Sequence, residues 1–254
     1  MIRKKSFPAK GWFVCLIAAA FYLYEYILRI TPSVMVTDLM QRLQITAGVF
    51  GLITALYYYA YTPMQFVTGI FLDRYGSKRI IGTGIVSCVL GSFLFGVSGA
   101  VWLSGTARFL MGFGSAFAFV GVLKLGTEWL PKSHFAFLAG LTTGLGMLGG
   151  MLGDITLISL LNKTSYYHLL HGITFLGILL IPFIFIFVKD TPYPKSASGN
   201  VQMSFRETFA ELKKIFKKPQ MWICGIMGNV LYLSLSVFAE LWGIKFLTVV
   251  YSLS

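Results

Sequence analysis

Charge is the scarcest feature of this sequence. Charged residues make up 12% of the 254 residues, and only nine of them are acidic. Soluble domains carry about 25% charged residues, so the composition excludes an ordinary soluble protein and indicates a polytopic membrane protein. A net charge of +12 would suit a nucleic-acid partner. The cations gather in short segments beside apolar runs, however, so we interpret them as topology signals and expect no nucleic-acid partner.

Cysteine, histidine and catalytic motifs are equally sparse. The three cysteines, Cys15, Cys88 and Cys224, lie inside apolar runs without C-x-x-C spacing, which excludes a disulfide framework. His168 and His171 lie one helical turn apart, and two ligands are too few for a metal site. Walker A, G-x-S-x-G and H-E-x-x-H patterns are absent. We therefore expect no metal, no cofactor, no ATP-driven pump and no enzyme.

Apolar runs, in contrast, fill most of the chain. A membrane-spanning helix needs about 20 apolar residues, and the sequence predicts seven such spans. Six of them form a bundle over residues 11–188, between a cytoplasmic N-terminus (1–10) and a cytoplasmic linker (189–219). The seventh belongs to residues 220–254. The predicted spans are 11–34, 47–72, 80–97, 102–125, 135–161, 169–188 and 221–241.

The distribution of lysine and arginine sets the orientation. Cations are concentrated at the N-terminus, at 74–79, at 132 and through the linker, whereas the alternate loops hold Arg42, Lys163 and Lys245. By the positive-inside rule the N-terminus is cytoplasmic, and we expect a bacterial inner membrane.

The linker contains a predicted amphipathic helix. Ser204 and Glu207 form a capping box, and Phe205 to Phe216 supply an apolar face that ends in lysines. Such a helix would lie on the inner membrane surface with anionic lipid as its partner. A calmodulin-type target helix is the alternative.

Two motifs carry a family resemblance. The turn between the second and third spans reads G-x-x-x-D-R-x-G-x-K-R, and the fourth span contains R-F-L-M-G-F-G-S-A from Arg108 to Ala116. Both resemble the major facilitator superfamily of secondary transporters. The resemblance implies an all-α transmembrane bundle whose six-helix half is a 3+3 inverted repeat, and a turn that helps close a cytoplasmic gate. The gate residues are Gly69, Asp73, Arg74, Gly76, Lys78 and Arg79.

The first span has one polar and aromatic face. Tyr22, Glu25, Tyr26 and Arg29 follow i, i+3, i+4, i+7 spacing, so this face must point at protein or water. We interpret Arg29 as the ligand of an anionic group and Glu25 as its partner or a proton carrier. The alternative is an ion pair that lets both side chains tolerate the membrane. The pattern Y-x-x-x-Y-x-x-R is similar to organophosphate and organic-anion transporters.

Further spans add candidate cavity residues. Tyr57 and Tyr61 lie too deep in the second span to be interface anchors. By the resemblance, Arg108 would support the cavity and proton coupling. Asn229 and Tyr232 share a face of the seventh span. Lys124 lies about 160° around the helix from Arg108, so we do not expect it to share the cavity of Arg108 and expect it to reach the cytoplasmic surface instead.

These features predict a proton- or ion-coupled transporter of a small anionic or zwitterionic organic solute. A dipeptide or amino-acid transporter of the same superfamily is the second substrate class that fits them. The superfamily joins two six-helix halves, so we expect that a C-terminal half is missing and that the chain is a truncated form. A non-transporting membrane scaffold or a half-sized homodimer would also be consistent with this sequence.

Overall fold

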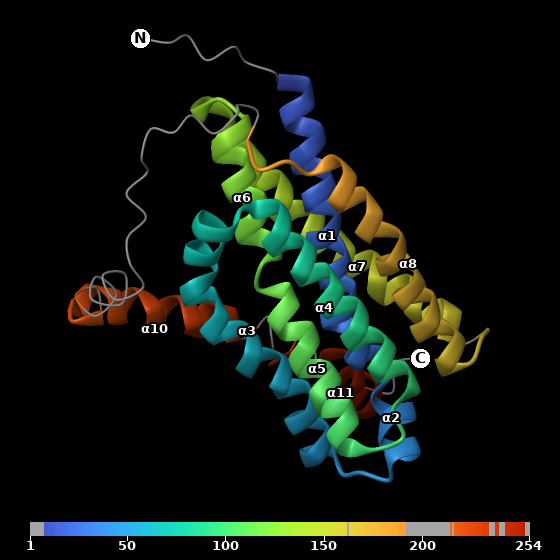
Figure 1. The fold of residues 1–254 in the computed structure, drawn as a ribbon. Helices are drawn as coiled ribbons and strands as arrows, with labels where there is room; N and C mark the ends of the chain where they lie inside the picture. The colour runs from blue at the N-terminus through green and yellow to red at the C-terminus, as the bar shows by residue number, and fades with distance from the viewer. Residues whose placement is uncertain are drawn as a thin grey trace, which may run out of the picture. The chain divides into compact units, whose positions relative to one another are not determined.

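The computed structural model describes residues 8–161, 163–191, 214, 216–233, 237–238 and 242–251, and these segments are helical and contain no strand. The chain divides into two compact units, Met1–Pro194 and Lys195–Ser254. The helices of the first unit in Figure 1 are α1 (Pro8–Val34), α2 (Val36–Leu43), α3 (Ala47–Tyr75), α4 (Ser77–Val97), α5 (Val101–Ser115), α6 (Ala118–Trp129), α7 (Phe135–Leu161) and α8 (Tyr166–Phe187). The second unit contains α10 (Pro219–Leu233) and α11 (Gly243–Tyr251).

The predicted spans and the observed helices agree closely in the first unit. Five helical segments of the described chain are long and apolar enough to cross a membrane, and a sixth is added when α2 and α3 count as one span bent by 113°. The short helix α2 was not predicted, since its eight residues are too polar for a span. The bundle is therefore an integral, multi-pass membrane domain.

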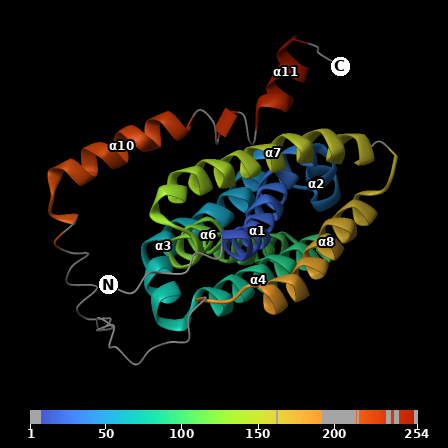
Figure 2. The same ribbon diagram turned by 90° about the horizontal axis from the view of Figure 1, so that it is seen from above.

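Helix packing in the first unit follows the pattern of two inverted three-helix repeats. Helix α1 packs along α7, and α3 packs along α5, so each repeat places its first helix against the second helix of the other. The third helices, α4 and α8, pack against each other. Figure 2 shows α1 enclosed by its neighbours, with α4 beside α8.

Glycines permit the closest of these contacts. A Cβ atom on Gly114 of α5 would lie 2.3 Å from the carbonyl oxygen of Gly84 in α4. A Cβ on Gly112 would lie 2.0 Å from the carbonyl oxygen of Tyr57 in α3. Small residues at such positions let helix backbones approach in a membrane, where close packing drives helix association.

The helix of the fourth span is interrupted at two residues. Residues 102–125 were expected to form one helix, but α5 ends at Ser115 and α6 begins at Ala118. The two glycines in this stretch lower its helix propensity, and their close contacts hold α5 against α3 and α4. The predicted span is confirmed as one apolar segment, Val101–Trp129, whose regular helix is interrupted at Ala116 and Phe117.

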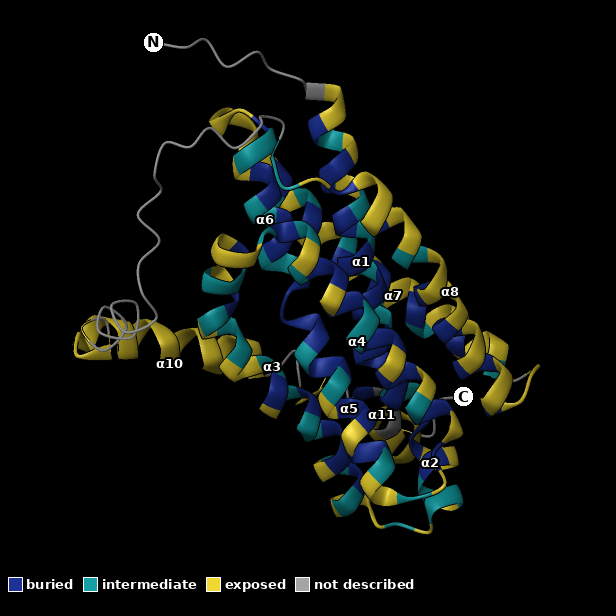
Figure 3. Cartoon of the chain, in the orientation of Figure 1, coloured by how far each residue is buried: buried dark blue, intermediate teal, exposed yellow. Residues whose placement is uncertain are grey.

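Burial is distributed as expected for a membrane bundle. Figure 3 shows α1 largely buried, whereas α7 and α8 each present an exposed face. The exposed side chains there include large apolar groups such as Met151, Ile155, Phe175 and Ile186, which suit a lipid environment.

One expectation falls largely, and another partly, outside the described residues. The amphipathic linker helix falls there except for Lys214 and residues 216–218. The seventh span was predicted over 221–241; the structure describes helix over Pro219–Leu233, and residues 234–236 and 239–241 are not described.

Candidate functional site

The polar face of α1 points into the first unit. Tyr22, Glu25, Tyr26 and Arg29 have exposed fractions of 7%, 0%, 5% and 7%. Their spacing brings them to one side of the helix, and they are covered by neighbouring helices as the charge cost of lipid exposure requires. Gly146 of α7 provides the room, because a Cβ there would lie 2.5 Å from the Tyr22 ring and 2.7 Å from the Tyr26 ring.

The carboxylate of Glu25 joins two helices. Arg29 donates a hydrogen bond and forms an ion pair with Glu25 Oε1. The hydroxyl of Tyr57 in α3 donates to the same Oε1 at 2.9 Å. One carboxylate oxygen therefore fixes both the arginine of α1 and a tyrosine of α3.

Aromatic rings surround the Arg29 guanidinium. Its Cζ lies 4.5 Å from the centroid of Tyr26, 5.3 Å from that of Tyr61 and 5.7 Å from that of Tyr57. The Tyr57 and Tyr61 rings are stacked, with an interplanar angle of 14°. Faces of aromatic rings stabilise a desolvated cation, so this environment holds a positive charge inside the bundle.

A second guanidinium also lies against the Tyr57 ring. Arg108 of α5 is 1% exposed, and its Cζ is 4.7 Å from the Tyr57 centroid. Its Nη1 donates to the Leu28 carbonyl at 2.9 Å and contacts Met111 Sδ at 3.5 Å. The Glu25 carboxylate and two guanidiniums thus converge on one tyrosine.

Seven of the predicted site residues meet in this cluster, and two do not. The seven come from α1, α3 and α5: Tyr22, Glu25, Tyr26, Arg29, Tyr57, Tyr61 and Arg108. Asn229 and Tyr232 belong to α10 in the second unit, where both are exposed, and they are described with that unit alone.

The predicted gate turn has partners that sequence reasoning missed. Lys124 Nζ of α6 lies 2.6 Å from Asp73 Oδ1 and 3.4 Å from Glu128 Oε1. Lys124 is part-exposed and lies beside the predicted gate turn, away from Arg108 as expected, but its two acidic partners were not predicted. The signal available in the sequence was the pair of acidic residues, Asp73 and Glu128, with which Lys124 forms ion pairs.

Asp190 provides the other partner of this turn. Its Oδ1 accepts the backbone N–H of Lys78 at 2.7 Å, in the first turn of α4. Gly76 adopts φ +88°, and a Cβ on it would lie 2.7 Å from Asp190 Oδ2. Positive φ and the crowding together require glycine at this position of the motif.

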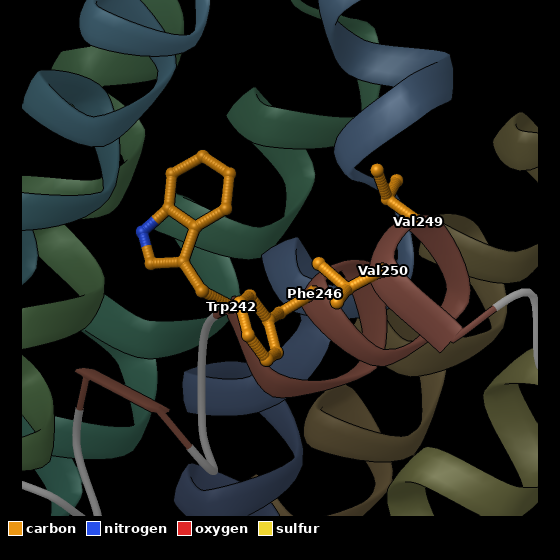
Figure 4. Close-up of a pocket in the computed structure, with 4 residues that line it drawn as sticks. All are labelled: Trp242, Phe246, Val249 and Val250. Atoms are coloured by element: carbon orange, nitrogen blue, oxygen red, sulfur yellow. The ribbon is translucent and has the colours of Figure 1, made fainter.

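Two pockets of the described residues, one in each unit, are lined mainly by apolar side chains. In the second unit, Trp242, Phe246, Val249 and Val250 line a pocket without a charged side chain (Figure 4). No group of three metal-ligating side chains occurs among the described residues. The charged cluster around Glu25 is therefore the candidate site.

Comparisons with curated proteins give several distant relatives. A probable sulfoacetate transporter of Cupriavidus necator is 25% identical over 174 residues, covering 67% of this chain and 40% of the relative. A chloroplastic ascorbate transporter of Arabidopsis thaliana is 22% identical over 250 residues, and the match covers 94% of this chain and 44% of the relative. A probable galactarate/D-glucarate transporter of Pseudomonas putida is 30% identical over 116 residues, covering 43% of this chain and 25% of the relative. The chain spans less than half the length of these relatives.

A solved structure shares the fold. A bacterial homologue of the human lysosomal transporter Spinster, inward-facing and unoccupied, superimposes with a TM-score of 0.71 at 18% identity. The match covers 98% of this chain and 57% of that structure. The sequence model of the Major Facilitator Superfamily matches residues 14–254, which is nearly the whole chain. The protein therefore belongs to the Major Facilitator Superfamily.

Proposed function

We propose that this chain carries the substrate site of a proton- or ion-coupled secondary transporter for small organic anions. The observation that carries the proposal is the placement of Arg29, a buried guanidinium on α1 surrounded by three tyrosine rings and paired with Glu25. In a low-dielectric interior a fixed cation attracts an anionic group far more strongly than it does in water.

Charge balance favours an anion over a neutral solute. Two guanidiniums, from Arg29 and Arg108, accompany the single carboxylate of Glu25 in this cluster. Arginine presents a planar set of donors that matches carboxylate and sulfonate groups. The relatives named above are a probable sulfoacetate transporter, an ascorbate transporter and a probable galactarate/D-glucarate transporter, and these solutes are organic anions at neutral pH.

Glu25 gives the site a means of coupling. Its carboxylate pairs with the arginine, so an incoming anion competes with Glu25 for Arg29. A proton on Glu25 would weaken that pair and release Arg29 for the anion. Binding of a proton and binding of an anion therefore favour each other, which is the linkage required for symport.

The family architecture supplies the remaining parts of the proposal. Transporters of this superfamily bind substrate near mid-membrane between two halves that rock against each other. We place the chain in a bacterial inner membrane with a cytoplasmic N-terminus and assign the 69–79 turn to the cytoplasmic gate. Asn229 and Tyr232 would contribute from the seventh helix.

A binding experiment tests the anion proposal directly. The chain is purified in detergent, and its thermal unfolding is followed by tryptophan fluorescence with sulfoacetate, glucarate, a neutral sugar and a dipeptide. We expect the anions to raise the midpoint and Arg29→Gln to weaken their binding by about tenfold or more, since a charged hydrogen bond is lost.

Arg42→Gln is the matched control for Arg29→Gln. Arg42 also lies over tyrosine rings, 5.0 Å from Tyr166 and 4.3 Å from Tyr167, but it belongs to α2 and not to the Glu25 cluster. Anion binding should survive this change. Stabilisation by the dipeptide alone would favour a peptide transporter, and the absence of any binding would favour a non-transporting scaffold.

A further inference from the structure

A proline interrupts α1 beside the charged cluster. Pro32 lies inside the helix and has no backbone N–H, so the carbonyl of Leu28, four residues earlier, has no partner in the helical ladder. In the apolar interior of a membrane an unsatisfied carbonyl costs several kcal/mol, so this group requires another donor. The structure provides one, because Arg108 Nη1 of α5 donates to the Leu28 carbonyl at 2.9 Å.

Side chains support the rest of this interrupted turn. The Thr31 hydroxyl donates to the Ile27 carbonyl at 2.6 Å, and the Ser33 hydroxyl donates to the Ile30 carbonyl at 2.6 Å. Hydroxyl donors on α1 itself therefore hold two carbonyls of the turn, whereas the carbonyl released by Pro32 is held from another helix. Arg108 is the side chain that ties this turn of α1 to α5.

The interrupted turn is also the turn that carries Arg29. Arg29 follows Leu28 directly, and its guanidinium is directed to Glu25 one turn earlier. The Cζ atom of Arg108 also lies 4.7 Å from the centroid of the Tyr57 ring. The hydroxyl of Tyr57 in turn donates to the Glu25 carboxylate. Arg108 therefore touches the backbone next to Arg29 and the tyrosine that orients Glu25.

We infer that Arg108 is a positioning residue: its guanidinium takes the place of the N–H that Pro32 lacks and thereby fixes the turn that presents Arg29 to substrate. This inference rests on the anion site proposed above. Arg108 itself does not bind the anion. It is 1% exposed, its Nη1 is occupied by the Leu28 carbonyl and Met111 Sδ, and its guanidinium lies over the Tyr57 ring.

A double-mutant cycle between residues 108 and 32 tests the inference. Pro32→Ala restores an N–H that can bond the Leu28 carbonyl within the helix, so it makes the Arg108 donor redundant. We expect Arg108→Ala to weaken glucarate binding by about tenfold in the Pro32 background and by less than about threefold in the Pro32→Ala background. Arg108→Gln, which retains an N–H donor without the charge, should recover part of the loss.

Two comparisons make the result specific. Pro182→Ala removes a proline from α8, a helix that contributes no residue to the Glu25 cluster. This control should leave the effect of Arg108→Ala on glucarate binding unchanged. A direct contact between Arg108 and the anion predicts the opposite result: the same loss in both backgrounds and no recovery with Arg108→Gln. That outcome overturns the inference.

A second readout separates this inference from the proposed function. The thermal midpoint without ligand is measured for the same four proteins of the cycle. If Arg108 replaces the missing N–H, Arg108→Ala should lower the thermal midpoint less in the Pro32→Ala background than in the Pro32 background. This expectation holds whether or not any anion binds. If the midpoint shifts of the two substitutions simply add, the inferred role of Arg108 is overturned. If the shifts are not additive but no anion binds, only the proposed function is overturned.

Discussion

At the residue scale, the Glu25 carboxylate is the centre of the site, because Arg29 and Tyr57 both donate to one of its oxygens. The spacing on α1 predicted that Glu25 and Arg29 share a face. It could not predict that Tyr57 completes the arrangement, since contacts between α1 and α3 depend on how deep each helix sits. Tyr57 is fully buried, and its hydroxyl donates to Glu25 from α3.

The Tyr57 hydroxyl can be tested alone. Tyr57→Phe removes the donor to Glu25 and keeps the ring that faces Arg108. We expect the free energy of unfolding to fall by about 1–2 kcal/mol, because a buried carboxylate loses a hydrogen bond. Denaturant unfolding in mixed micelles measures it. Tyr59→Phe, at a side chain that is 65% exposed, is the control and should have little effect.

At the element scale, close contact between backbones decides where helices α3, α4 and α5 lie. The small-xxx-small spacing of Gly112 and Ala116 indicated close helix packing, and the apolar runs predicted the spans within a few residues at most ends. The interruption between α5 and α6 was not predicted, because neither Ala116 nor Phe117 is a helix breaker and both keep right-handed helical dihedrals.

Gly112→Ala tests this packing. The added Cβ would meet the Tyr57 carbonyl oxygen at 2.0 Å, so the α3 and α5 backbones must separate. We expect a loss of about 1–3 kcal/mol, as for overpacked cores, and a lower yield of monodisperse protein in size-exclusion chromatography. Gly140→Ala, where an added Cβ meets nothing within 4 Å, should be neutral or slightly stabilising. Equal behaviour of the two variants would contradict the packing argument.

The cap on α4 is a second interaction at this scale that sequence reasoning missed. Asp190 follows α8 by three residues and accepts the Lys78 N–H at the beginning of α4, 112 residues away in the chain. A carboxylate at a helix N-terminus is stabilised by both the hydrogen bond and the helix dipole. Because this contact joins distant segments, no local capping pattern predicted it.

Substitutions at Asp190 separate the two contributions. Asp190→Asn keeps an acceptor and removes the charge, so we expect a loss of about 0.3–1 kcal/mol that shrinks in high salt. Asp190→Ala also removes the hydrogen bond and should cost about 1 kcal/mol or more. Thermal unfolding at low and high ionic strength checks both. A salt-independent loss for Asp190→Asn would show that the charge does not stabilise the cap.

At the scale of the whole molecule, the first unit has one basic end and one nearly neutral end. Trp129 Nε1 donates to the Lys189 carbonyl at 2.8 Å, and Gly11 lies against Trp129, so the beginning of α1, the end of α6 and the end of α8 meet at one end. Figure 1 shows the turn between α3 and α4 at the same end and α2 at the other. The basic end holds Lys10, Arg74, Lys78, Arg79, Lys132 and Lys189, and the opposite end holds Arg42 and Lys163.

This asymmetry predicts the orientation of the bundle in the membrane. Cytoplasmic loops retain lysine and arginine, so the basic end should face the cytoplasm. Alkaline phosphatase fused after residue 163 should be active, because it folds outside the cytoplasm, and the same enzyme fused after residue 132 or 191 should be inactive. Green fluorescent protein at the same three positions is the reciprocal control and should fluoresce only after 132 and 191. Phosphatase activity after residue 132 would reverse the orientation and place the 69–79 turn, with its Asp73–Lys124 pair, on the outer surface, where it could not act as a cytoplasmic gate.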